Sequence, residues 1–487
     1  MVFKKFSTVL AVAVAVVATF SNGVDSVSAS SLPRVHAGVH RTLRAQGTVN
    51  LIVTMKEGTE KTLATVKEAA FSDRGQQIAS MVDALEQSAK KSQGSVTSLL
   101  SQEAATSEPL FKTTTSFWVS NQVFIEGATF ELIEKLAQVD SISEIREEIV
   151  VKLRKPVVSD AVASNFTTEA VGTAAIIAPT NPKWGVKMIQ ASDVWATGNL
   201  GQNVNVGIID TGVRSTHVAL KGNFLGDFGW YDPEKKAAAP YDPDGHGTHT
   251  TGTVAGGNGI GVAPGAKWLH CKGCRTDDCT ESDLLACAQF MTCPTNPAGT
   301  KKDCSKAPRV INNSWAGDQG DTFFNAAVKT WVAADITPVF ANGNSGSKCS
   351  TAESPGDVSD VITVGATDST DTLADFSSRG PSIGGLLKPD ISAPGVRVYS
   401  ASWVDDSSYR YESGTSMAAP HVTGAIALLL SAKPTLTYTQ VKSLLYTTAD
   451  RSGLGATGQT CGGTSDSKFP NNQYGNGRLN ILTAVKK

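Results

Sequence analysis

The chain has 487 residues, more than one ordinary domain needs and enough for two or three. Hydrophobic residues make up 40% and charged residues 18%, which is globular composition and excludes a disordered chain. The formal net charge of −2 predicts no nucleic-acid partner and no attraction to an acidic membrane.

The first 29 residues are typical of a secretory signal. Lys4 and Lys5 precede an apolar run, Val9–Phe20, that is shorter than the roughly 20 residues needed to span a bilayer. A buried core helix is the alternative, but a terminal position behind two lysines favours a signal peptide over residues 1–29. We find no later membrane segment by inspection and expect a secreted, extracellular product.

Residues 48–153 are predicted to form a small α+β unit. The expected order β-α-β-β-α-β is ferredoxin-like. Apolar periodicity and turn residues place its elements as a strand at Val49–Met55, a helix at Gln76–Glu103, two strands within Ser116–Gly127, a helix at Thr129–Gln138 and a strand at Ile142–Val151.

Residues 154–182 lack a sustained period and end in prolines, so we predict a linker. Asn165 begins an Asn-Phe-Thr triplet, a possible N-glycosylation site.

Residues 183–487 alternate short apolar runs with helical segments. Such runs are typical of parallel strands buried on both faces, so we predict an α/β domain with a mostly parallel sheet flanked by helices. Active sites in such sheets collect at the carboxyl ends of the strands. The runs are Val204–Asp210, Arg309–Ser314, Thr337–Asn342 and Val361–Thr367, and the helical segments include Ser282–Met291 and Phe323–Ala334.

All eight cysteines follow residue 270. An even number in an exported chain favours disulfides, and eight cysteines allow 105 pairings. Cys271 and Cys274 could instead form a metal or redox pair, but no second pair with zinc spacing follows them.

Three side chains could form a nucleophilic triad. Asp210 ends an apolar strand and could orient an imidazole, His246 lies between two glycines, and Ser416 precedes an apolar helix. Each also has a simpler interpretation: Asp210 and Ser416 as caps, and His246 with His249 as metal ligands. No nearby glutamate completes a zinc-peptidase motif around these histidines.

An oxyanion would need hydrogen-bond donors near Ser416. The backbone N–H of Ser416, at a helix start, is one candidate, and the side-chain amide of Asn344, just past a strand, is the other.

Six segments together resemble the signature blocks of the subtilisin family of serine proteases. Two further stretches, GVAPGAKW at 261–268 and INNSW at 311–315, look closest to the bacillopeptidase F-like branch of that family. The resemblance covers residues 184–484 and implies a subtilisin-like fold, an endopeptidase, Asp210, His246 and Ser416 as the triad and Asn344 as oxyanion donor. The segments are GIIDTGV at 207–213, HGTHTTGTVAG at 246–256, NNSWAG at 312–317, ANGNSG at 341–346, FSSRGP at 376–381 and GTSMAAPHVTG at 414–424.

The resemblance also implies partners. Proteins and peptides would be the substrates, and residues 48–153 would be an inhibitory prodomain that assists folding. We expect a monomer.

The resemblance places the primary specificity pocket between two stretches of backbone. One wall would be Ser314, Trp315 and Ala316, and the other Ala341, Asn342 and Gly343. Counting back from Pro355 puts Glu353 near the floor, where a carboxylate would favour Lys or Arg before the scissile bond. A solvated Glu353 with an apolar pocket is the alternative that we favour, because loop glutamates are usually exposed.

No cofactor is expected to be required. Family members with a strong calcium site carry an inserted loop after the catalytic histidine, and the corresponding stretch, Thr253–Gly265, is short here. Calcium is therefore possible without that loop, and no metal ligand is assigned.

Two rival functions remain. A catalytically inactive, subtilisin-shaped binding protein would not need an intact triad. An esterase would need a G-x-S-x-G elbow and the order Ser, Asp, His, whereas Ser416 lies in G-T-S-M-A.

Overall fold

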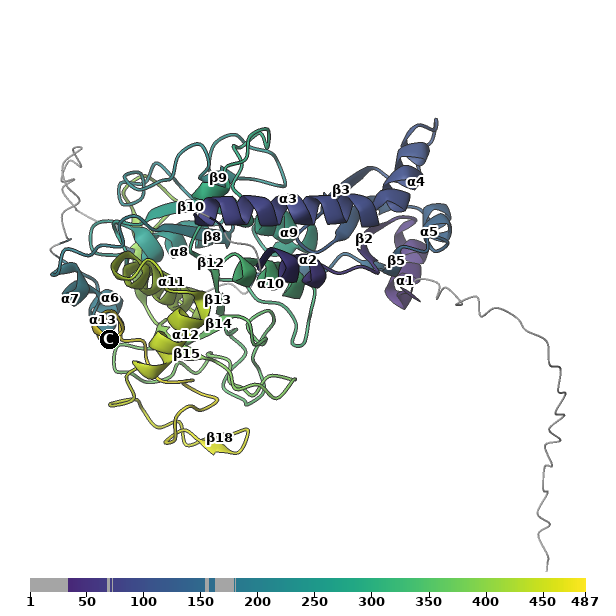
Figure 1. The fold of residues 1–487 in the computed structure, drawn as a ribbon. Coiled ribbons are helices and arrows are strands. Elements are labelled where there is room, and N and C mark those ends of the chain that lie inside the picture. Colours follow the sequence, from purple (N-terminus) through teal and green to yellow (C-terminus); the bar gives the residue numbers. More distant parts are fainter. Residues whose placement is uncertain (1–33, 68–70, 72, 154–156, 163–178, 180) are drawn as a thin grey trace, which may run out of the picture.

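A computed structural model describes residues 34–67, 71, 73–153, 157–162, 179 and 181–487 (Figure 1). The predicted signal peptide at residues 1–29 and the possible glycosylation site at Asn165 lie outside these residues.

A seven-stranded parallel sheet forms the centre of the larger unit, as the sequence predicted. Its order is β15-β14-β13-β12-β8-β10-β9. The strands are β8 (Asn205–Asp210), β9 (Trp230–Tyr231), β10 (Lys267–Lys272), β12 (Val310–Asn313), β13 (Thr337–Ala341), β14 (Ile362–Thr367) and β15 (Ile391–Pro394).

Helices cover both faces of this sheet, and each face has its own core cluster. Residues of α8 (His246–Ala255) and α11 (Thr415–Ala432) pack with Ile208 of β8 on one face. Residues of α9 (Glu281–Thr292) and α10 (Asn325–Ala333) pack with the next residue, Ile209, on the other. Successive strand residues thus point to opposite faces, which explains the nearly continuous apolar runs.

The remaining elements of this unit lie around the sheet. They are α6 (Trp184–Met188), α7 (Ala191–Trp195), β11 (Asp278–Thr280), η1 (Cys304–Lys306), β16 (Val398–Ala401), β17 (Tyr409–Ser413), α12 (Tyr438–Thr447), β18 (Thr460–Cys461), β19 (Thr464–Ser465) and α13 (Ile481–Lys486).

The prediction that no later segment could cross a membrane by length and composition overlooked helix α11. This helix is long and apolar enough to cross a bilayer by length and composition, but 89% of it is buried inside the protein. Such burial is that of a core helix.

The N-terminal unit has a five-stranded sheet in the order β1-β5-β2-β4-β3. Its last four strands pair antiparallel in the predicted ferredoxin-like arrangement. The elements are β1 (Arg34–Val35), α1 (Ala37–Gln46), β2 (Val49–Met55), α2 (Glu60–Lys67), α3 (Arg74–Ser92), α4 (Gly94–Ala104), β3 (Thr113–Phe117), β4 (Gln122–Ala128), α5 (Phe130–Leu136), β5 (Ile142–Glu147) and β6 (Val150–Lys152).

Three features of this unit differ from the prediction. It includes β1 and α1, which precede residue 48. The single helix at Gln76–Glu103 is two helices, because buried Gln93 at the break turns its amide to Asn121 and Gln122.

The strand predicted at Ile142–Val151 is also divided. The chain leaves the N-terminal sheet after Glu147 because Glu148 and Ile149 bond to the start of α9. Ser282 N–H donates to Glu148 Oε1 (3.1 Å), and Ile149 N–H donates to Glu281 Oε2 (3.2 Å). The chain then forms β6 on the edge of β11 in the larger unit.

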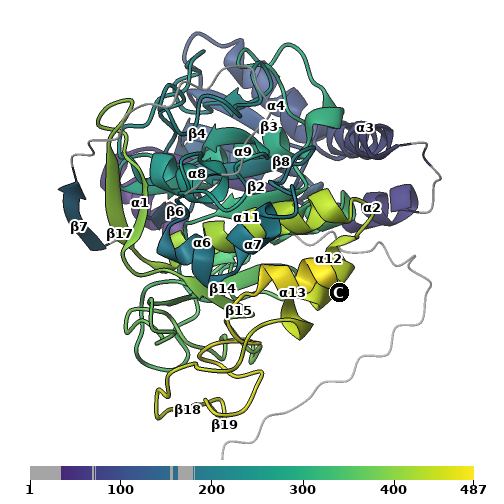
Figure 2. The ribbon, with the colours of Figure 1, turned by 90° about the vertical axis from the view of Figure 1, so that its left-hand side faces the viewer.

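Part of the predicted linker is a strand. Residues Val157–Val162 form β7, which pairs antiparallel with β17 and makes it the central strand of a three-stranded sheet (Figure 2). This run contains three valines, a β-branched residue that favours strands, but its partner lies about 250 residues further along the chain.

The N-terminal unit lies against the face that carries α9 and α10 (Figure 1). The apolar side of α3, including Ile78, Met81 and Leu85, belongs to the same core cluster as these two helices. Arg146 forms a two-pronged ion pair with Glu281, both oxygens at 2.6 Å, and the Glu281 side chain is fully buried. The two units therefore share one hydrophobic core and a buried charge pair.

Four disulfides join all eight cysteines, which confirms the predicted disulfides and excludes a Cys271–Cys274 metal pair. The pairs are Cys271–Cys287, Cys274–Cys279, Cys293–Cys304 and Cys349–Cys461.

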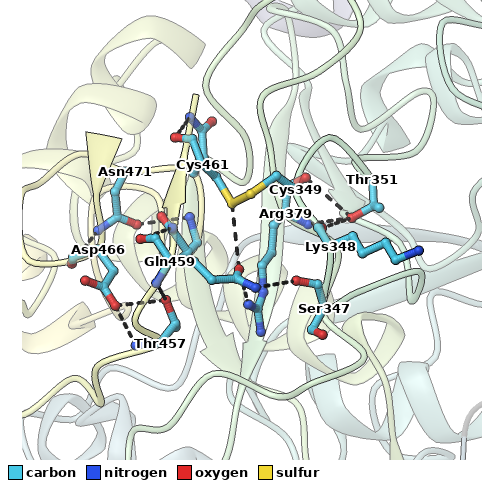
Figure 3. The surroundings of a disulfide bond; sticks show 12 residues. Ser347, Lys348, Cys349, Thr351, Arg379, Thr457, Gln459, Cys461, Asp466 and Asn471 are labelled. Atoms are coloured by element: carbon cyan, nitrogen blue, oxygen red, sulfur yellow. Dashed lines mark hydrogen bonds between the residues drawn. A yellow bond between two sulfur atoms is a disulfide. The ribbon is translucent and has the colours of Figure 1, made fainter. Parts of the chain in front are cut away.

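The pair Cys349–Cys461 closes by far the longest loop, with a separation of 112 residues. It ties the segment that follows Asn344 to the C-terminal region, where Gln459 also donates to Ser347 O at 2.9 Å (Figure 3). This disulfide therefore anchors the loop that leads to Glu353.

We predict that this disulfide contributes most to stability, because a cross-link that closes a longer loop restricts the unfolded chain more. Loop entropy assigns about 5 kcal/mol to Cys349–Cys461 and about 2 kcal/mol to Cys274–Cys279, whose separation is five residues. Urea unfolding of the two double Cys→Ser variants, both in a Ser416→Ala background to prevent self-digestion, measures the difference. Equal losses of unfolding free energy would contradict the loop-length account.

Candidate active site

The predicted site residues meet at the carboxyl end of the central sheet. Asp210 is the last residue of β8, Ser314 follows β12, and Asn344 lies three residues beyond β13. Helices α8 and α11 begin here with His246 and Ser416 in their first turns.

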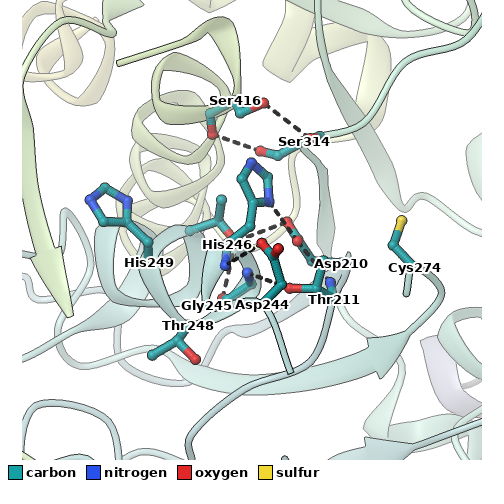
Figure 4. Close-up of polar contacts among 12 residues, drawn as sticks. Asp210, Thr211, Asp244, Gly245, His246, Thr248, His249, Cys274, Ser314 and Ser416 are labelled. Carbon is teal, nitrogen blue, oxygen red and sulfur yellow. Dashed lines mark hydrogen bonds and ion pairs between the residues drawn. The ribbon is translucent and has the colours of Figure 1, made fainter. Parts of the chain in front are cut away.

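The side chains of His246 and Asp210 are joined by a short hydrogen bond (Figure 4). His246 Nδ1 lies 2.6 Å from Asp210 Oδ1, and both side chains are at most 1% exposed. Thr211 N–H donates to the same oxygen (2.8 Å), and Thr250 Oγ1 donates to Asp210 Oδ2 (3.1 Å). The carboxylate is thus fixed on both oxygens and can hold one imidazole orientation.

The start of α8 is fixed by Asp242. Its carboxylate accepts from Gly245 N–H (2.8 Å), from Thr248 N–H (2.9 Å) and from the Thr211 hydroxyl (3.0 Å). Gly245 has φ of +99°, and a Cβ there would lie 2.1 Å from the Trp403 ring, so glycine is needed immediately before His246.

Ser416 is held at the start of α11 by an interaction that depends on Pro420. Pro420 has no N–H to donate to the carbonyl four residues earlier, which is that of Ser416. Ser314 Oγ donates to this carbonyl instead, at 2.7 Å. Because Pro420 leaves this carbonyl without a helical donor, Ser416 is hydrogen-bonded to Ser314 at the end of β12.

The Ser416 hydroxyl is not bonded to His246 in this state. Ser416 Oγ donates to Ser314 O at 3.1 Å, and buried His246 Nε2 has no hydrogen-bond partner among the described residues. Figure 4 shows Ser416 on the Nε2 side of the imidazole ring. Ser416 Oγ would have to leave Ser314 O before it could donate to His246 Nε2.

The Asn344 amide is oriented by the residue before Ser416. Thr415 donates to Asn344 Oδ1 through both its N–H and its hydroxyl, each at 2.9 Å. With the amide oxygen held, Nδ2 is the atom of Asn344 available as a donor. The N–H of Ser416 lies in the first helical turn, where no intrahelical acceptor exists.

Hydrogen bonds join the two backbone stretches predicted as walls of the specificity pocket to Glu353 and its neighbour Ser354. Gly317 N–H donates to Ser354 O (2.8 Å), which joins the segment after Ala316 to the residue after Glu353. Glu353 N–H donates to Asn342 O at 3.1 Å on the other wall. Glu353 is only 2% exposed, so the alternative of a solvated side chain is wrong.

The other pocket residues contribute backbone rather than side chains. Trp315 is buried and packs its ring against Phe324 and Phe340 in the core. Ala341 ends β13, and the Asn342 side chain donates to Ser378 O at 2.5 Å.

Several contributing residues were not identified from the sequence. Thr415 and Thr250 orient Asn344 and Asp210, and Ser314 was assigned to a wall without its bond to Ser416. Pro420 lies four residues after Ser416 and has no N–H to donate, so the sequence could have indicated that the Ser416 carbonyl lacks a helical partner.

His249 does not join His246 in a two-histidine site. Its Nε2 bonds to Val398 O at 3.0 Å, and burial lowers the pKa of His249 well below its usual value. The described residues hold no group of three or more potential metal ligands among His, Cys, Asp and Glu.

The pKa of His246 is raised above its ordinary value. Burial alone would lower it, but the charge of Asp210 and the hydrogen bond to that carboxylate outweigh burial. Burial dominates at two other histidines. It lowers the pKa of His270 to about 3 despite the charge of Asp210, and it lowers the pKa of His421 to about 4.

Residues 201–477 match the subtilase family. The chain is 36% identical to bacillopeptidase F of Bacillus subtilis (strain 168) over 396 residues, which cover 76% of this chain but only 26% of that protein. It is 36% identical to subtilisin DY of Bacillus licheniformis over 309 residues, 62% of this chain and 98% of that protein. Serine protease AprX of Bacillus subtilis is 35% identical over 288 residues, 52% of this chain and 62% of its own length.

We predict that kcat/KM of the processed protein decreases at acid pH, and that this acid limb of the pH profile has a pKa above 6.5. His246 acts as a base only when it is neutral, and Asp210 raises the pKa of His246. Asp210→Asn should lower activity by about 10⁴-fold and move this limb to lower pH. A pH profile for a peptide substrate measures both effects. Asp193→Asn, which removes an exposed carboxylate on α7, should leave the limb unchanged, and a limb unaffected by Asp210→Asn would refute the assignment.

Proposed function

Because the chain belongs to the subtilase family of serine endopeptidases, we propose that it is a secreted preproenzyme that cleaves proteins with Asp210, His246 and Ser416 as its triad. The observation that carries this proposal is the buried 2.6 Å hydrogen bond between His246 and Asp210 beside Ser416 at a helix start. Each side chain is supplied by a different element of one rigid core.

In the proposed mechanism, His246 Nε2 takes the Ser416 proton as Oγ attacks the carbonyl carbon of the peptide. Asp210 stabilises the imidazolium that forms. The Ser416 N–H and Asn344 Nδ2 donate to the oxyanion, and removal of such a donor typically costs 10²–10³-fold in turnover.

The second half of the reaction releases both products. His246 returns its proton to the leaving amine as the C–N bond breaks, which leaves an ester between the substrate acyl group and Ser416. Water activated by His246 then hydrolyses this ester and restores the serine hydroxyl. No cofactor has a role in these steps.

The N-terminal unit is proposed to be an inhibitory prodomain and folding aid. Two observations support this: β6 lies along β11 next to the candidate site, and Arg146 pairs with buried Glu281 at the start of α9. A preformed unit that covers α9 and α10 could speed the assembly of a parallel sheet, whose non-local contacts form slowly.

Export is supported by the four disulfides, which persist in oxidising compartments. The short predicted signal at residues 1–29 fits the same route. We expect the released enzyme to act as a monomer on protein substrates.

We predict that Ser416→Ala abolishes both peptide hydrolysis and self-processing, because it removes the nucleophile. Asn344→Ala should retain KM and lower kcat by about 10²–10³-fold, through loss of one oxyanion donor. Steady-state kinetics and electrophoresis of the precursor measure these outcomes. Ser431→Ala, near the other end of α11, should behave as wild type.

Normal processing of the Ser416→Ala chain in a protease-free system would overturn the proposal. Labelling by a fluorophosphonate separates the rival functions: an inactive binding protein would not react, whereas the protease should be labelled at Ser416.

We predict that residues 34–153, added as a separate chain, inhibit the processed enzyme and accelerate its refolding. Arg146→Ala should raise the inhibition constant by 10²-fold or more, because it leaves the Glu281 carboxylate buried without its cation. The control is Arg44→Ala on the exposed side of α1, which should inhibit like the unmodified segment. A segment that neither inhibits nor assists refolding would show that this unit is not a prodomain.

A further inference from the structure

Two segments of the precursor's own chain pair with strand edges beside the candidate triad. On one side, β6 pairs with β11, Leu153 N–H donates to Asp277 O (2.9 Å), and Val151 lies over Gly317. On the other side, β7 pairs with β17 so that Val157 lies opposite Ser413. The same chain therefore approaches from one edge and leaves along the other.

Both edges are attached directly to the triad. Cys274 N–H donates to Asp210 O at 3.0 Å, and the Cys274–Cys279 disulfide closes the short loop that presents Asp277 and β11. On the other side, β17 ends at Ser413, three residues before Ser416. Added strands on such edges are a common way of binding extended peptides.

Four residues separate β6 from β7, and the first of them, Leu153, is still bonded to Asp277. Between Leu153 and Val157 the sequence reads Arg154, Lys155, Pro156. Four residue steps of extended chain reach at most about 14 Å. We therefore expect the first bond that Ser416 cleaves in the precursor to lie between the two paired strands.

Glu353, the residue predicted for the floor of the specificity pocket, is a buried acid. The Glu353 side chain packs against the backbone of Gly343, where a Cβ would lie 2.5 Å from Glu353 Cδ. Gly343 has φ of +100° and directly precedes Asn344, so the carboxylate lies close to the proposed oxyanion donor. Ser345 Oγ donates to Glu353 Oε1 at 2.5 Å and fixes the side chain in this orientation.

Further contacts hold the loop that carries Glu353 in place. Ser354 O accepts from Gly317 N–H, and Thr351 N–H donates to Arg379 O at 2.8 Å. The Cys349–Cys461 disulfide anchors the same loop. A carboxylate held in a low-dielectric pocket attracts a guanidinium or ammonium group much more strongly than one in water.

We propose that the pocket closed by Glu353 takes an arginine or lysine side chain, so that the enzyme cleaves after basic residues, beginning with its own Arg154–Lys155 bond. This inference rests on the proposed protease function. Cleavage after Lys155 is disfavoured, because the next residue is Pro156, whose ring replaces the N–H of the leaving nitrogen.

The self-cleavage step is an ordinary hydrolysis. Ser416 Oγ bonds to the Arg154 carbonyl carbon, the bond to the Lys155 nitrogen breaks, and that amine leaves with a proton from His246. Water then releases the Arg154 carboxylate. The processed enzyme begins at Lys155.

The first test scans peptides that differ only in the residue before the scissile bond. Wild type should cleave after Arg or Lys about 10- to 100-fold better, in kcat/KM, than after Met, the gain typical of a hydrogen bond to a charged group. Glu353→Gln should lose this preference, and labelling of the variant at Ser416 by a fluorophosphonate shows that it folds. The control variant Asp318→Asn removes an exposed carboxylate two residues after Ala316 and should keep the wild-type preference.

The second test uses the full-length precursor. Sequencing of the processed enzyme should give Lys155 as its first residue, and Arg154→Gln should slow its formation by the same 10- to 100-fold, whereas Lys155→Gln should process at the wild-type rate. A wild-type preference for apolar residues, a basic preference that survives Glu353→Gln, or a first residue other than Lys155 would overturn the proposal. Wild type that cleaves no peptide would instead overturn the protease function itself.

Discussion

The burial of one apolar helix organises the whole active region. All residues of α11 from Thr415 to Leu430 are buried between α8 and the strands of the central sheet. Burying so much apolar surface is a large part of what stabilises the domain, and it fixes the helix along its length. Because Ser416 lies in the first turn, the same packing that stabilises the core also fixes the position of the proposed nucleophile.

The rest of the site is built around that fixed start. Pro420 leaves the Ser416 carbonyl without a helical partner, and Ser314 supplies one from the end of β12. Thr415, at the start of α11, orients the side chain of Asn344, which follows β13, the next strand of the sheet. The sheet register therefore determines the spacing of nucleophile, oxyanion donor and pocket wall. The Glu353 floor belongs to the same unit, since its backbone is bonded to Asn342.

The sequence predicted the parts of this structure that depend on local pattern. The apolar run ending at Asp210, the two helix starts and the ferredoxin-like order were all accessible from residue types and spacing. Features that depend on distant partners were not. The breaks at Gln93 and Glu148 arise from side chains bonded elsewhere in the fold, and the burial of Glu353 follows from the closure of Gly317 on Ser354. Disulfide pairing could not be deduced either, because many pairings satisfy the same count.

The precursor occupies both edges beside Ser416 with its own chain. Hydrogen exchange of the full-length Ser416→Ala protein, before and after cleavage by a trace of wild-type enzyme and removal of the N-terminal unit, tests this most directly. We predict slow exchange in both β11 and β17 of the intact chain and faster exchange in β11 after removal, because the N-terminal unit takes β6 with it whereas β7 stays on the processed chain. Exchange that is fast in either strand of the intact precursor would contradict this prediction.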